Sequence, residues 1–196
     1  QYALQVTNDG PSDAADVVEI WDHPLAPSAL SQAAFLRRVR EEGIRYRRLE
    51  AGDRLEFGGA EFSILWPPRA RSAAFTADLS LVFSLTFRRS SFLFPAQASS
   101  AAQREILRLH PRLGAEVLLA PARGSRSRTH EPFLRAVSPR LAVLARGKKY
   151  FGRYPADCSD CLAGLGAEVH RTGEEGCVIV RSDGEKVWAE RGMIPP

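Results

Sequence analysis

The chain has 196 residues, 44% of them hydrophobic and 26% charged, so it can bury one sizeable core and fits a single domain over residues 1–196. No apolar run reaches the roughly 18 residues that a helix needs to cross a bilayer, so no membrane span is predicted within the segment. The formal charge of +4 and the pI near 9.3 mildly favour an anionic partner, and three cysteines, an odd number, predict no disulfide framework.

The first half of the sequence predicts strands with one helix among them. After Gln1 the chain enters a strand-like run almost at once, which is typical of a segment cut from a longer polypeptide. A helix is predicted at 31–42, where apolar residues share one face and Gly43 follows as a stop. Short apolar runs between turn residues predict strands at 3–7, 17–21, 45–49, 54–57 and 60–66.

The second half predicts strands and helices in alternation. Helical spacing predicts helices at 99–109, 131–137 and 156–165. Strands are predicted at 80–87, 91–94, 117–120, 140–145, 167–171, 177–181 and 185–189. Strand meanders, mixed with helices that could cover two sheets, predict an α/β sandwich of four layers in the order helix, sheet, sheet, helix.

One stretch carries most of the functional signal. The apolar run 117–120 ends at Pro121 and Gly124, because proline cannot donate to a ladder and glycine permits a sharp exit. A loop with arginines and hydroxyl groups follows, as far as His130. In open α/β sheets ligands are handled at the carboxyl ends of strands, so chemistry is expected in this loop.

Several short strings, none of them specific alone, occur in an order and spacing typical of one family. They are YRRLEAGDRL at 46–55, LWPP at 65–68, LSLV at 79–82, GS at 124–125 and VRSDG at 180–184. From about residue 17 to residue 187 the chain resembles the C-terminal metallo-β-lactamase-like domain of ComEC, the DNA-uptake channel of competent bacteria. The stretch PARGS at 121–125 is similar to the family's Pro-His-His-Gly-Ser metal motif, without its two histidines.

The resemblance implies a metallo-β-lactamase fold, an αββα sandwich, that handles or degrades a DNA strand with two divalent metals. It implies that the domain is tethered to the bacterial inner membrane through its parent, with the channel portion of the same polypeptide as a partner. It also implies that the family's first strands, which precede its histidine-rich loop, are missing from this segment. No small-molecule substrate is evident.

The metal ligands of the family are replaced at every position that can be matched. The histidine-rich loop corresponds to 7–13, the later Gly-Asp to 96–97, the histidine pair to 122–123 and the Gly-His-Pro to 152–154. The residues at the ligand positions are Asn8, Gly10, Ser12, Asp13, Gln97, Ala122, Arg123 and Arg153. A dinuclear site needs several converging histidines and carboxylates, and a guanidinium repels a dication. We therefore expect no metal cofactor and no catalysis.

Two basic loops carry candidate phosphate contacts. Their residues are Arg123, Ser125, Arg126, Arg128, Lys148, Lys149 and Arg153. The resemblance implies that both loops meet at the edge where the family has its active site. One hypothesis is a groove in which guanidinium groups bind single-stranded or duplex DNA, weakly and without sequence preference. The other is a solvated face of charged loops with no ligand.

Three alternatives stay open. A metal-dependent phosphodiesterase or nuclease would need ligands that have been matched wrongly. A structural zinc site would use Cys158, Cys161, His170 and Cys177, although the first two fall in a predicted helix. A hydrolytic triad would use Ser125, His130 and Asp157, although no nucleophile elbow surrounds the serine.

Overall fold

The computed structural model describes residues 3–6, 19–23, 30–69, 78, 80–146 and 156–192. In the first half, the helix and the strands lie within a few residues of the predicted ranges. They are β1 (Ala3–Val6), β2 (Glu19–Asp22), α1 (Leu30–Glu41), β3 (Arg45–Arg48), β4 (Arg54–Phe57) and β5 (Ala60–Trp66). The stretch 7–13, matched to the family's histidine-rich loop, lies outside the described residues.

The second half also follows the prediction and adds three short helices. The strands are β6 (Val82–Phe87), β7 (Ser90–Phe94), β8 (Val117–Leu119), β9 (Leu141–Leu144), β10 (Glu168–Arg171), β11 (Cys177–Ser182) and β12 (Val187–Gly192). The predicted helices are α2 (Ser100–Leu109), α3 (Glu131–Val137) and α4 (Ser159–Gly164). The sequence did not predict α5 (Thr172–Glu175) or the 3₁₀ helices η2 (Pro121–Gly124) and η3 (Arg126–Arg128).

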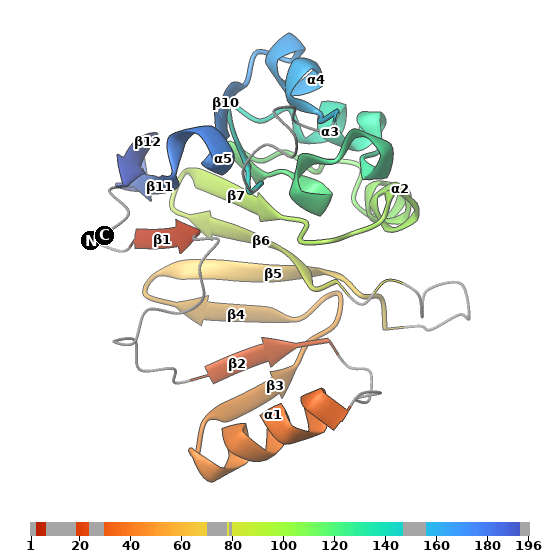
Figure 1. The fold of residues 1–196 in the computed structure, drawn as a ribbon, viewed down its shortest axis with the longest axis vertical. Coiled ribbons are helices and arrows are strands. Elements are labelled where there is room, and N and C mark those ends of the chain that lie inside the picture. The colour runs from red at the N-terminus through yellow and green to blue at the C-terminus, as the bar shows by residue number, and fades with distance from the viewer. Residues whose placement is uncertain are drawn as a thin grey trace.

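The central sheet has seven strands in the order β10-β9-β8-β7-β6-β5-β4 (Figure 1). Strands β4 to β7 pair antiparallel, with two-residue turns between β4 and β5 and between β6 and β7, whereas α2, α3 and α4 lie between the strands β7 to β10, which pair parallel. A parallel connection needs a crossover of a dozen or more residues, and each of these helices lies in one. The carboxyl ends of β7, β8, β9 and β10 therefore share one edge of the sheet.

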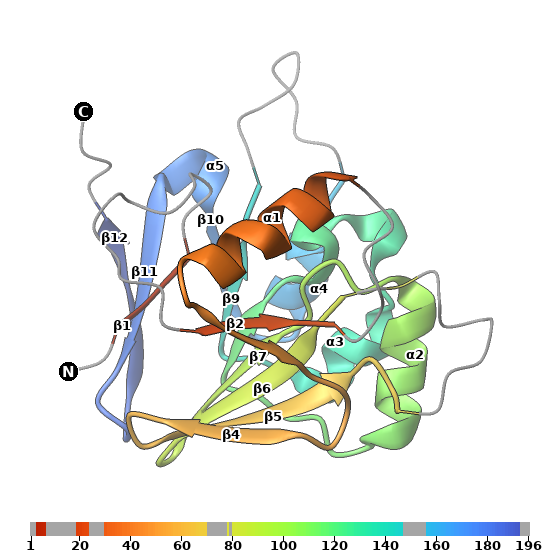
Figure 2. The ribbon, with the colours of Figure 1, turned by 90° about the horizontal axis from the view of Figure 1, so that it is seen from below.

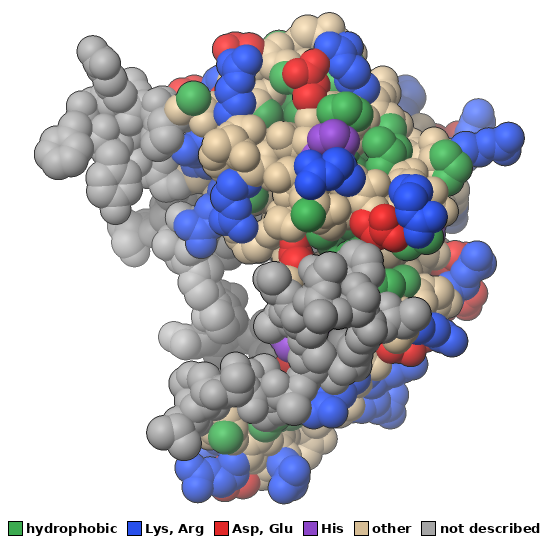
Figure 3. Space-filling model, turned by 90° about the vertical axis from the view of Figure 1, so that its right-hand side faces the viewer, with side chains coloured by type: hydrophobic (Ala, Val, Ile, Leu, Met, Phe, Trp, Pro, Cys, Tyr) green, Lys and Arg blue, Asp and Glu red, His purple; other side chains and the backbone are tan. Residues whose placement is uncertain are grey.

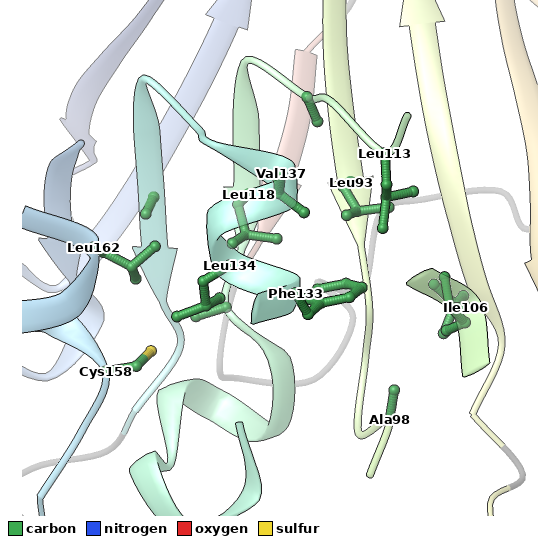
Figure 4. Packing of buried hydrophobic residues seen from close by; sticks show 14 of the residues in the cluster. Leu93, Ala98, Ile106, Leu113, Leu118, Phe133, Leu134, Val137, Cys158 and Leu162 are labelled. Carbon is green, nitrogen blue, oxygen red and sulfur yellow. The ribbon is translucent and has the colours of Figure 1, made fainter. Parts of the chain in front are cut away.

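The two faces of the sheet belong to different cores, because strand side chains alternate. In β9, Ala142 and Leu144 point into the cluster beneath α2, α3 and α4, while Leu141 and Val143 point into the cluster shared with β11 and β12. Figure 4 shows Leu162, Leu118, Phe133 and Ile106 spread along the first cluster in that order. Each such fully buried side chain contributes about 1.5–3 kcal/mol relative to exposure.

The remaining elements complete the layers on the second face. Strand β11 pairs with β1 and β12, and β2 pairs with β3. Trp21 of β2 packs with Phe62 of β5, so this pair of strands covers the antiparallel end of the central sheet. Figure 2 shows α1 on the side of β2 and β3 away from β4 and β5. The order helix, sheet, strand layer, helix confirms the predicted fold class.

Among the described residues, no helix combines the length and apolar character that spanning a bilayer requires.

Candidate functional site

The candidate site lies at the shared carboxyl edge of the parallel strands. Ala96 and Gln97 follow β7, η2 and η3 follow β8, and Arg146 follows β9. Figure 3 looks at the side of the molecule to which this edge points, where Lys and Arg side chains are spread with a histidine among them. The loop predicted to carry chemistry, residues 121–130, therefore lies at this edge, and we call it the edge loop.

Successive residues of η2 have left-handed backbone conformations. The φ angles are 47° at Ala122, 58° at Arg123 and 76° at Gly124. The Ala122 amide donates to the Ala96 carbonyl oxygen at 2.9 Å, which ties this turn to the end of β7. The backbone thus brings together Gln97 and the pair Ala122 and Arg123, the replaced ligand positions that the sequence places in two different loops.

Glycine is required at position 124 for two reasons. Its φ of +76° is a conformation that side chains with a Cβ rarely adopt, and an added Cβ would lie 2.7 Å from Cγ of Leu144. Because Leu144 is fully buried in the core, it has little room to move. The turn therefore sits directly on the end of β9.

The residues just before α4 hold the other side of the loop. The Cys158 amide donates to the Gly124 carbonyl at 2.9 Å, and the Arg126 amide donates to the Ala156 carbonyl at 3.3 Å. Ser125 and Asp157 form an isolated antiparallel bridge. Main-chain contacts on two sides thus fix the path of the loop.

A buried glutamine of α2 anchors the far end of the loop. Gln103 has no exposed surface, and its Nε2 donates to the carbonyl oxygens of Ala98 at 2.7 Å and Arg128 at 2.9 Å. Its Oε1 accepts from the backbone amide of His130 at 2.8 Å. One side chain therefore satisfies three main-chain groups on two loops, a role that the sequence reasoning missed.

Three arginines of the loop are exposed and have no acidic partner among the described residues. Among the described residues no carboxylate lies within ion-pair distance of Arg123, Arg126 or Arg128, whereas exposed Arg108 and Arg135 on the neighbouring helices are paired with glutamates at 2.6 Å. Arg128 donates to the main-chain oxygen of Gln97 at 3.3 Å and lies 3.5 Å from its Oε1. The described part of the chain thus does not neutralise the positive charge of this loop.

The remaining candidates for phosphate binding fall in two places. Ser125 is half-buried, and its Oγ lies 3.3 Å from Oγ of Ser127 beside the arginines. Lys148, Lys149 and Arg153 lie outside the described residues.

Behind the loop, Asp157 faces two arginines. Its Oδ2 lies 3.9 Å from Nη1 of Arg146 and 3.6 Å from Nε of Arg171, and its Oδ1 accepts from the amide of Ser159 at 3.0 Å. Burial alone would raise the pKa of Asp157, but the Ser159 hydrogen bonds and the two guanidinium groups outweigh it, so the pKa lies below its usual value.

The hydrolytic triad is not assembled in the structure. The Ser125 hydroxyl contacts Ser127, the Asp157 carboxylate contacts Ser159 and the arginines, and the hydrogen bonds of the described residues join neither of them to the His130 ring. Burial, and next the Arg104 guanidinium, lower the pKa of His130. The described residues therefore do not bring the three side chains together as a triad.

The zinc alternative is not assembled either. Cys158 is buried in the core beneath the helices, where burial raises the pKa of its thiol to about 11. His170 lies between Glu168 and Glu175 at 3.1 and 3.0 Å, and Cys177 packs beside Gly192. Within the described part of the chain no three His, Cys, Asp or Glu residues are grouped as metal ligands would be.

The residues at the replaced positions do not fit a pair of divalent metals. Ala122 offers no ligand atom, its amide is already bonded to Ala96, and Arg123 brings a cation to the neighbouring position. Gln97 offers only an amide oxygen, which faces Arg128. The other replaced positions, Asn8, Gly10, Ser12, Asp13 and Arg153, lie outside the described residues.

Comparison with known structures and proteins defines the class of domain. A mutant of CmlA beta-hydroxylase superposes with a TM-score of 0.52 over 78% of this chain and 38% of that chain, at 14% identity, a likeness of fold alone. No protein-family model matches the chain. The layers, the edge loop and this likeness define a metallo-β-lactamase fold.

The sequence comparison agrees with the predicted resemblance. ComE operon protein 3 of Bacillus subtilis (strain 168) is 27% identical over 120 residues, which make up 61% of this chain and 15% of that protein. Over these residues the chain is similar to a ComEC protein, as the motifs predicted.

Proposed function

We propose that the chain is a non-catalytic domain of a ComEC-type DNA-uptake protein, and that its edge loop holds a DNA strand during natural transformation. Binding is weak and independent of sequence. The parent protein tethers the domain to the bacterial inner membrane, and the channel portion of that polypeptide is its partner. This proposal rests on the ComEC relationship together with the charges of the edge loop.

The observation that carries the proposal is the set of unpaired arginines on a fixed loop. Arg123, Arg126 and Arg128 project from a backbone that is held by main-chain contacts to Ala96, Ala156 and Cys158 and by Gln103. Guanidinium groups bind phosphate oxygens through paired hydrogen bonds, and a pre-organised loop loses less entropy on binding. A solvated loop that binds no ligand would not need these hydrogen bonds to hold its backbone in place.

The residues at the replaced positions support the absence of catalysis. The family brings metal ligands to the positions of Gln97, Ala122 and Arg123, and here these residues meet at one edge without a metal-binding set. A guanidinium in that position supplies positive charge that does not depend on an ion. The surface can thus attract a phosphate backbone without cleaving it.

The salt dependence of binding tests the proposal. Each phosphate contact releases counterions, so for a single strand the slope of log affinity against log salt is about −0.7 per contact, or about −2 for three arginines. Fluorescence anisotropy with a labelled oligonucleotide measures this slope. Replacing Arg123, Arg126 and Arg128 with alanine should bring it close to zero.

Three exposed arginines of α1, Arg37, Arg38 and Arg40, supply the matched control, because their replacement removes the same charge from another element. The slope should then change by much less. Equal effects from both sets would show that only overall charge matters. No binding at low salt would leave the loop as a solvated face and refute the proposal.

A further inference from the structure

Two arginines behind the edge loop share a single buried carboxylate. The side chains of Arg146 and Asp157 are 13% and 9% exposed, and that of Arg171 is 28% exposed. The nearest nitrogens of Arg146 and Arg171 lie 3.9 and 3.6 Å from the same oxygen of Asp157, which is too far for a direct hydrogen bond. The two guanidinium groups therefore lie close to the carboxylate of Asp157 but form no direct hydrogen bond with it.

Arg146, Asp157 and Arg171 form a cluster in which some hydrogen-bonding groups are paired and one is not. The other oxygen of Asp157 accepts from the amide and hydroxyl of Ser159. Nη1 of Arg146 is buried and has no hydrogen-bond partner in the structure. Arg171 has a second acidic neighbour, Glu174 at 3.7 Å, whose side chain is 43% exposed. A buried guanidinium nitrogen without an acceptor is unfavourable, so the cluster favours an additional anion.

The position of the cluster relates it to the arginines of the edge loop. Ser125 bridges Asp157 through the backbone, and Arg126 donates its amide to Ala156, the residue before Asp157. The Thr172 hydroxyl donates to the carbonyl oxygen of Arg146 at 3.0 Å and joins the end of β10 to the same spot. The ends of β8, β9 and β10 thus converge where Arg146 and Arg171 face Asp157.

We propose that Arg146 and Arg171 form a site for a phosphate monoester dianion, the terminal phosphate of a DNA strand whose backbone lies on the edge loop. The inference rests on the proposed function and deepens it. A terminal phosphate has three free oxygens and a single ester bond, so it can reach a recessed guanidinium from one side. An internal phosphodiester continues in both directions and cannot enter where so little side-chain surface is exposed.

Two measurements test the site on the chain itself. In the first, anisotropy compares oligonucleotides of one sequence that carry a 5′-phosphate, a 3′-phosphate or only hydroxyl ends. The preferred phosphorylated end should bind about tenfold more tightly than the hydroxyl form, because the strand gains charge-assisted hydrogen bonds. In the second, inorganic phosphate at constant ionic strength should raise the melting temperature.

Arg146→Met keeps the length of the side chain and removes its charge, so it should abolish both effects. Arg140→Met is the matched control, because Arg140 lies at the opposite end of β9, paired with Glu116 at 3.1 Å, and its loss should leave both effects intact. If Arg146→Met does not fold, Arg171→Met provides the second variant. The triple replacement of Arg123, Arg126 and Arg128 should weaken all three oligonucleotides alike and leave the phosphate-induced rise in melting temperature unchanged.

The outcomes separate this inference from the proposed function. Stabilisation by inorganic phosphate without preference for a strand end supports the site and assigns it to a free oxyanion. Equal binding of all oligonucleotides, together with no stabilisation by phosphate or with equal stabilisation of Arg146→Met, overturns the site. The salt slope of the edge loop can hold in either case.

Discussion

The side-chain amide of Gln103 donates to the carbonyl oxygen of Arg128 at 2.9 Å across 25 residues of sequence. It joins the interior of α2 to a loop whose side chains face outward. Because Gln103 is fully buried, its hydrogen bonds cannot be replaced by bonds to bulk water.

Gln103→Leu should destabilise the fold and loosen the loop. The substitution leaves the carbonyl oxygens of Ala98 and Arg128 and the amide of His130 without their partner, at a cost of about 2–4 kcal/mol. Urea unfolding measures this cost. Gln97→Ala, at an exposed position of the loop between β7 and α2, is the control and should change stability by about 0.5 kcal/mol or less. Similar losses for both variants would contradict the anchoring role.

Gly124→Ala should cost more than an alanine at another glycine of positive φ. The new methyl group meets the buried Leu144 at 2.7 Å and the backbone is strained, which together cost about 3 kcal/mol or more. Gly166→Ala isolates the backbone cost, because Gly166 has a φ of +86° with no atom within 4 Å, and should cost about 1–2 kcal/mol. Equal melting temperatures for the two variants would show that the Leu144 side chain moves and makes room for the added methyl group.

Asp157 should make stability depend on acid pH. Its folded-state pKa is depressed, so the ionised carboxylate stabilises the fold above its unfolded pKa of about 3.9, and this contribution is lost as the pH falls through the folded pKa. Asp157→Asn should therefore be destabilised by about 2 kcal/mol at pH 7, with the difference from wild type shrinking below about pH 4. Urea titrations at several pH values measure it.

Asp160→Asn serves as the control for that titration, because Asp160 is exposed on α4 three residues from Asp157. Its unfolding free energy should follow that of the wild type at every pH. If Asp157→Asn also followed the wild type down to pH 3, the ion pairs with Arg146 and Arg171 would contribute nothing to the fold.

The purified chain should contain less than one equivalent of zinc or manganese. Gln97, Ala122 and Arg123 meet at the edge without a ligand set, so a divalent ion gains little there. Elemental analysis measures the metal content, and incubation with single-stranded and duplex DNA should show no metal-dependent cleavage. Two bound metals per chain, with cleavage that a chelator stops, would restore the nuclease alternative.

The sequence predicts the elements because their signals are local. The boundaries of α3 at Glu131 and Val137 follow from a short amphipathic run, and the strand ending before Pro121 follows from a proline that cannot continue a ladder. The fold class follows from the order of such segments. The pairing of β1 with β11 joins residues more than 170 positions apart, and no local pattern encodes it.

The candidate site was predictable in part. The strand end and its arginines are visible in the sequence, and the ComEC resemblance places Gln97 near Ala122. The 3₁₀ turns were not predictable, because a carbonyl of Ala96 and a side chain from α2 determine them. Gln103 has the ordinary appearance of a polar residue on a helix surface, and only the packing of α2 shows that it is buried.

Main-chain atoms hold the edge loop at the ends of β7 and α4, while the side chain of Gln103 anchors its far end. The amides of Ala122, Arg126 and Cys158 and the carbonyls of Ala96, Ala156 and Gly124 make the contacts that determine its path. The side chains at positions 123, 126 and 128 can therefore be substituted without a change in the backbone conformation. With the backbone held in this way, the chemistry of the edge can change through substitutions alone, with no insertion, deletion or change of topology.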